Sequence, residues 1–326
     1  MRLQNKSLAA ILGAGILLAG VLPLVLYWPA FHQPVQSELS PVHNVGLLEQ
    51  WLVVITAFGV KPTYMLLSLL WIIWLWRSQA ADLVALRWGF IWFLGGEIAC
   101  TVNFVCLRGH SAITDYLHGY GMAVGFSFVA YAALEGMDSR VIKCSPPNER
   151  CAALSLCRAC IKHAAVPCGL HRFFALLIPA LIAVALMLPC VPVQPVPHRV
   201  TILNSVQDFS NPLWSQLFEG RYCPWLAVAL LLLSWAALLF KREDPVATAM
   251  LLFAAALGPL GFGFMRVFPR TAYAENLAWS NIWEELTELI FVLGVGWVLW
   301  LFRQSLFRVN GAATVRSGPE APSLSA

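Results

Sequence analysis

The densest group of reactive side chains in this sequence is a cysteine cluster in one polar segment, residues 138–172. Five of the nine cysteines fall there, among several basic residues: Cys144, Cys151, Cys157, Cys160 and Cys168. A Cys-x-x-Cys pair places two thiolates on one turn, and such soft ligands favour zinc or iron. The pattern therefore predicts an iron–sulfur cluster or zinc, and its spacing does not choose between them. The alternative is that these cysteines pack as small apolar side chains in a juxtamembrane helix.

A second group consists of ionisable residues within or beside long apolar stretches. Glu97 is near the middle of such a stretch, where a carboxyl group must be paired, hydrogen-bonded or protonated. Asp115 and His118 are spaced to share one helix face, and Glu285 and Glu288 open another apolar stretch with Glu284. We interpret these as a candidate catalytic or binding site: Glu97, Asp115, His118, Glu285 and Glu288. The simpler interpretation is that the acids near helix starts are solvated groups that stabilise the helix dipole.

Three chemistries suit this second group. Carboxylates with one histidine can hold zinc, iron or manganese. His118 with Met122 could instead coordinate copper or the iron of a haem. A histidine and carboxylate pair could also exchange protons with a quinol or with a transported substrate. Lys61, Arg266 and Arg270 are the expected counter-ions on the same side of the membrane.

The elements that carry these residues follow from composition. The 326 residues are 59% hydrophobic and 12% charged, with a mean hydropathy of +0.71, which excludes an ordinary soluble domain. A hydrocarbon core of about 30 Å needs roughly 20 apolar residues per helix. Eight such windows predict an all-α, polytopic membrane helix bundle: Leu8–Trp28, Phe58–Trp76, Trp88–Cys106, Leu117–Met137, Phe173–Val191, Pro224–Phe240, Val246–Met265 and Asn281–Phe302. The stretch Leu47–Val60 is either a re-entrant or interfacial helix or an extension of the second span.

The basic residues predict the orientation, because Lys and Arg are retained on the cytoplasmic side. With both termini inside, only six of the 21 basic residues lie outside: Lys61, Arg108, Arg199, Arg221, Arg266 and Arg270. This topology divides the chain into spans one to four (1–137), the cysteine-rich loop (138–172), spans five to eight (173–303) and a disordered cytoplasmic tail (304–326). The outer loop Val191–Tyr222 is long enough for a small lid, and Cys190 and Cys223 either form a disulfide across it or pack unpaired.

The resulting prediction is a redox or metal-linked protein of the bacterial cytoplasmic (inner) membrane. Its cysteine loop would hold an iron–sulfur cluster or zinc, and its intramembrane site would hold a second metal, a quinone or a proton path. The expected partners are membrane lipid and a soluble redox protein on the cytoplasmic face, with no nucleic acid. A proton- or ion-coupled transporter with a metal-sensing loop is the main alternative, and a metal-dependent membrane hydrolase is weaker because no nucleophile motif supports it.

Overall fold

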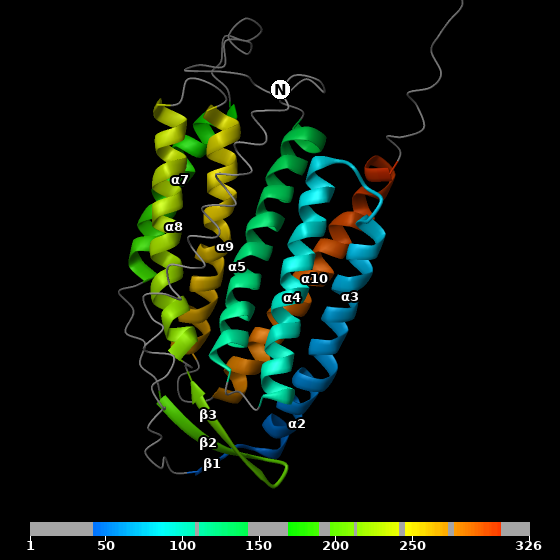
Figure 1. The fold of residues 1–326 in the computed structure, drawn as a ribbon, viewed down its shortest axis with the longest axis vertical. Helices are drawn as coiled ribbons and strands as arrows, with labels where there is room; N and C mark the ends of the chain where they lie inside the picture. The colour runs from blue at the N-terminus through cyan, green and yellow to red at the C-terminus, as the bar shows by residue number, and fades with distance from the viewer. Residues whose placement is uncertain are drawn as a thin grey trace, which may run out of the picture.

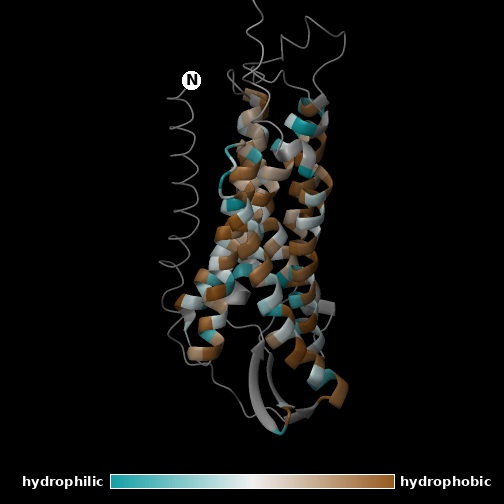
Figure 2. Cartoon of the chain, turned by 90° about the vertical axis from the view of Figure 1, so that its right-hand side faces the viewer, coloured by the Kyte–Doolittle hydropathy of each residue, from teal (hydrophilic) through white to brown (hydrophobic). Residues whose placement is uncertain are grey.

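Seven helices of the computed structural model are long and apolar enough to cross a membrane. The structure describes residues 42–107, 111–142, 169–188, 196–211, 214–240, 245–272 and 277–307. The spanning segments are Leu47–Leu75, Ala81–Cys106, Ile113–Arg140, Leu170–Met187, Tyr222–Phe240, Val246–Phe268 and Asn281–Arg303. They lie side by side in one helix bundle (Figure 1), and their residues are mainly hydrophobic along their length (Figure 2). The chain is thus a multi-pass, helical-bundle membrane protein, as the sequence predicts.

The seven spans correspond to the second to eighth predicted windows, and the first window lies outside the described residues. Several helices extend past their predicted ends. The elements are α2 (Leu47–Ile55), a wide π-helical turn η2 (Thr56–Val60), α3 (Lys61–Leu75), α4 (Ala81–Cys106), α5 (Ala112–Gly136), a second wide turn η3 (Met137–Ile142), α7 (Gly169–Met187), α8 (Trp214–Phe240), α9 (Pro245–Ala272) and α10 (Leu277–Phe307). Residues 138–142, which were expected to open the polar loop, are helical, and the rest of that loop lies outside the described residues.

The segment before Lys61 extends the second span and is not a separate interfacial helix. Helices α2 and α3 form one continuous helical run, Leu47–Leu75. Pro62 has no N–H to donate, and the backbone widens just before it, where the N–H of Lys61 bonds to the carbonyl of Thr56. Wide turns of this type often occur at functional sites. Here the turn directly precedes Lys61 and lies one helical turn before Tyr64.

A segment before α2 and the hairpin between α7 and α8 form a small sheet that the sequence did not indicate. Strands β1 (Val42–Asn44), β2 (Val196–Ile202) and β3 (Ser205–Asn211) pair in the order β1-β2-β3, with β1 parallel and β3 antiparallel to β2. The sheet lies at the end of the bundle where α4 ends and α5 begins, which we call the sheet end (Figure 1). The backbone N–H of Leu203 in the hairpin turn donates to Gln50 of α2. The start of α2 and the β2–β3 hairpin, which the predicted topology places on the same side of the membrane, therefore lie together.

Helices α4 and α5 approach closely through glycines. A Cβ on Gly96 would lie 2.9 Å from the carbonyl oxygen of His118, and one on Gly125 would lie 3.0 Å from the carbonyl oxygen of Gly89. Small residues at such interfaces let helix backbones approach one another in a membrane. The close contact brings Glu97 on α4 next to His118 on α5.

Candidate functional site

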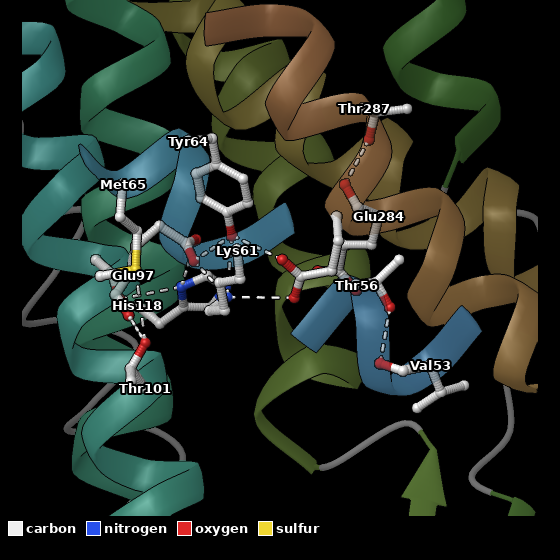
Figure 3. A network of polar contacts seen from close by, with 12 residues as sticks. Val53, Thr56, Lys61, Tyr64, Met65, Glu97, Thr101, His118, Glu284 and Thr287 are labelled. Atoms are coloured by element: carbon white, nitrogen blue, oxygen red, sulfur yellow. Dashed lines mark hydrogen bonds and ion pairs between the residues drawn. The ribbon is translucent and has the colours of Figure 1, made fainter. Parts of the chain in front are cut away.

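Lys61 lies at the centre of a buried ionic site between α3, α4 and α10 (Figure 3). Its Nζ is 2.5 Å from Oε2 of Glu97 and 3.2 Å from Oε1 of Glu285. The side chain of Glu97 is fully buried, and those of Lys61 and Glu285 are 13% and 19% exposed. One ammonium group thus pairs with two carboxyl groups in a region from which water is largely excluded. We call these three residues, with Tyr64 and Glu288, the Lys61 site.

Tyr64 joins the two carboxyl groups of this site. Its hydroxyl is 2.8 Å from Oε2 of Glu97 and also 2.8 Å from Oε2 of Glu285, and it accepts a hydrogen bond from Lys61 at 3.1 Å. A phenol has a single hydrogen to donate, and an ionised carboxylate can only accept. Two ionised carboxylates would therefore compete for one hydrogen at this position.

Two further carboxylate oxygens are buried without a hydrogen bond. Oε1 of Glu97 and Oε2 of Glu288 find no partner among the described residues. Glu288 is 7% exposed and interacts electrostatically with Lys61 and Tyr64. Nδ1 of His118 lies 3.5 Å from Oε1 of Glu97, and that nitrogen is also 3.2 Å from the carbonyl oxygen of Gly96. An unsatisfied buried carboxylate is costly, so these oxygens mark a site where a proton or ligand can be accommodated.

A second ionic cluster forms around Arg266 of α9, which is 7% exposed. Its Nε donates to Oε2 of Glu219 at 3.0 Å, and its Nη1 donates to Oε1 of Glu284 at 2.6 Å. The guanidinium also lies over the ring of Phe262. Glu219 precedes the apolar span of α8, and burial raises the pKa of its carboxyl to about 7 although the charge of Arg266 opposes this. We call Arg266, Glu219 and Glu284 the Arg266 cluster.

Asp115 has a different environment from the other predicted acids. It accepts a hydrogen bond from Nδ2 of Asn103, whose Oδ1 in turn accepts from the backbone N–H of Ser111. These contacts join the end of α4 to the start of α5 on either side of the short connection between them. Asp115 thus lies beside the site and has a role in holding the two helices together.

The structure brings four of the five predicted intramembrane residues together: Glu97, His118, Glu285 and Glu288. Of the expected counter-ions, Lys61 and Arg266 pair with these acids or their neighbours, and the side chain of Arg270 is not described. Tyr64 and Glu219 were not predicted. The signal for Tyr64 was its spacing of three residues from Lys61 on one helix face, and Glu219 was assigned to a loop because α8 was expected to begin at Pro224.

The cysteine-rich loop lies outside the described residues, and with it all five predicted metal ligands: Cys144, Cys151, Cys157, Cys160 and Cys168. Cys190 also lies outside them, and Cys223 is a buried free thiol in α8. Within the described ranges, no three His, Cys, Asp or Glu side chains are arranged to hold a metal ion. The arrangement at Lys61 thus gives no support to the second metal expected there, and a quinone stays a prediction.

The fold and this site define the chain as a multi-pass membrane protein with an acid-rich ionic site buried within its helix bundle. No protein-family model, curated protein or solved structure matches the chain, so its function is argued from the site itself.

Proposed function

We propose that this membrane protein takes up and releases a proton at the Lys61 site. The observation that carries the proposal is the hydroxyl of Tyr64, which lies 2.8 Å from one oxygen of Glu97 and 2.8 Å from one oxygen of Glu285. With one phenolic hydrogen, both contacts are favourable only if one carboxyl group carries a proton of its own. Glu97 has the shorter contact with Lys61, so the proton belongs on Glu285.

The balance of charge supports the same proposal. The Lys61 site and the Arg266 cluster together contain five carboxyl groups (Glu97, Glu219, Glu284, Glu285 and Glu288) and two fixed cations, Lys61 and Arg266. With every group ionised, the net charge would be −3, since two cations offset two of the five carboxylates. An uncompensated charge costs several kcal/mol where water is excluded. Bound protons reduce this cost without any change in the fold.

Infrared spectroscopy of the purified protein tests the proposal, because a protonated carboxyl group has a carbonyl stretching band that a carboxylate lacks. We expect such a band at neutral pH, and we expect Glu285→Gln to weaken it. The carboxyl of Glu219, whose pKa is about 7, accounts for part of the band that remains. Glu135→Gln, which changes a carboxyl group far along α5 from the site, is the matched control and should leave the band unchanged. A wild-type protein without this band at neutral pH would contradict the proposal.

What the proton exchange serves depends on the cysteine-rich loop. We propose that the loop binds an iron–sulfur cluster or zinc and that proton exchange accompanies electron transfer, on the evidence of its Cys-x-x-Cys pattern. The test is iron, zinc and sulfide analysis of anaerobically purified protein, with Cys157→Ser/Cys160→Ser as the variant. Iron with sulfide that is lost in the variant supports a redox protein, and metal-free wild type contradicts it.

Substrate uptake into proteoliposomes that collapses in Glu97→Gln would instead favour a proton-coupled transporter.

A further inference from the structure

The polar side chains of the bundle are distributed unequally about the Lys61 site. Toward the sheet end, the next turns carry the Arg266 cluster, His118 and the Asn103–Asp115 pair. Toward the opposite end, the nearest described ionisable residue on α4 is Arg87, ten residues or about 15 Å from Glu97. On α10 it is Arg303, fifteen residues or about 22 Å from Glu288. The site therefore has charged neighbours on one side only.

Four phenylalanine rings pack together on the opposite side of the site. Phe90 and Phe93 of α4, Phe126 of α5 and Phe291 of α10 form a contiguous group with centroid separations of 5.2 to 6.2 Å, which we call the phenylalanine cluster. Phe90 and Phe93 are fully buried. Tyr64 stands at the boundary, because its hydroxyl belongs to the ionic site while its ring lies 5.9 Å from that of Phe93. Close-packed rings have no group that can carry a proton.

His118 connects the Lys61 site with the Arg266 cluster. Its Nδ1 is 3.5 Å from the unsatisfied Oε1 of Glu97, and its ring interacts electrostatically with Arg266 and Glu284. An imidazole can accept a proton on one ring nitrogen while the other nitrogen releases one. In that step Nε2 gains a proton, Nδ1 gives its own to Oε1 of Glu97, and the ring stays neutral overall.

We infer that the Lys61 site exchanges protons with the sheet end only, through the Arg266 cluster and His118, and that the phenylalanine cluster seals it from the opposite side. This inference rests on the proposed proton site and adds its direction of access. Glu284, whose side chain is 33% exposed, is the most exposed acid of the Lys61 site and the Arg266 cluster and receives the proton first. A sealed opposite side means that transport across the membrane would require the four rings to separate, whereas one-sided redox chemistry would not.

The test uses the full-length protein in liposomes and dicyclohexylcarbodiimide, an apolar reagent that modifies protonated carboxyl groups from within the membrane. Modification of Cys106, which is exposed at the end of α4 toward the sheet, by an impermeant maleimide identifies the vesicles with the sheet end outside. The pH is then lowered on one side at a time, and labelling of the α10 peptide is measured by mass spectrometry. We expect labelling to rise by up to about tenfold for each unit by which the pH on the sheet side is lowered. Labelling should not depend on the pH of the other side.

Variants make the inference sharper. Phe126→Ala should let labelling respond to the pH of both sides, whereas Phe174→Ala, which removes an equally large buried ring from the contact of α7 with Phe253 of α9, should not. His118→Gln should slow the response to the sheet-side pH at least severalfold. Wild-type labelling that follows the opposite side, or both sides equally, would overturn the inference while leaving the proton site in place. No labelling at any symmetric pH would overturn the proton site as well.

Discussion

Glu219 occupies the space that a side chain at Gly119 would need: a Cβ on Gly119 would overlap Oε1 and Cδ of Glu219. The ion pair of Glu219 with Arg266 at 3.0 Å therefore depends on glycine at a position of another helix. The pairing of Glu219 with Arg266 is thus held by the packing of α5 against α8 as well as by charge.

Gly119→Ala should destabilise the protein by about 1–3 kcal/mol, because the added methyl group displaces a buried carboxyl group from its cation. Thermal unfolding in detergent would measure the loss. Gly261→Ala is the matched control, since a Cβ there meets nothing within 4 Å and alanine is the better helix former. Equal melting temperatures for the two variants would show that Glu219 moves without cost.

Lys61→Met removes the cation that offsets the ionised Glu97, and we expect it to cost about 3–5 kcal/mol of stability. The double variant Lys61→Met/Glu97→Gln should recover most of this loss, because it removes the carboxylate left unpaired. A double-mutant cycle from thermal unfolding measures the coupling between the two side chains. Additive losses would mean that Lys61 does not stabilise Glu97. The control is Arg87→Met, which changes a cation that is hydrogen-bonded to the carbonyl of Trp76.

The spans were predictable from the sequence because bilayer thickness fixes the length of an apolar run. Glu97 was recognisable for the same reason, since no other acid lies so deep in a window. The role of Tyr64 could not be predicted, because it depends on which helices are neighbours.

The hairpin of β2 and β3 could not be predicted either, because its turn places Leu203 and Asn204 at positive φ without the glycine that usually marks such turns. Pro224 gave a misleading helix start, since α8 continues through it to Trp214.

Stability should fall as the pH rises from about 4.5 to about 7, in part through Glu219. Burial raises the pKa of this carboxyl to about 7 from its ordinary value of 4.5. The folded protein therefore binds more protons than the unfolded chain within that window, so raising the pH favours unfolding. The contribution is on the order of 3 kcal/mol. Melting temperatures across the window should decline less in Glu219→Gln than in the wild type or in Glu135→Gln, and parallel curves would contradict this assignment.

Tyr64→Phe isolates the hydroxyl that joins Glu97 and Glu285, because phenylalanine keeps the ring that contacts Phe93. Loss of this buried hydrogen-bonding group should cost about 1–3 kcal/mol of stability. The proton on Glu285 then loses its acceptor, so its carbonyl stretching band should move to higher frequency and stay present. Tyr131→Phe, which removes a hydroxyl 3.4 Å from Glu135, is the matched control and should leave the band in place. A band at the wild-type frequency in Tyr64→Phe would mean that the proton lies elsewhere, and the pairing of Glu285 with Tyr64 would no longer explain it.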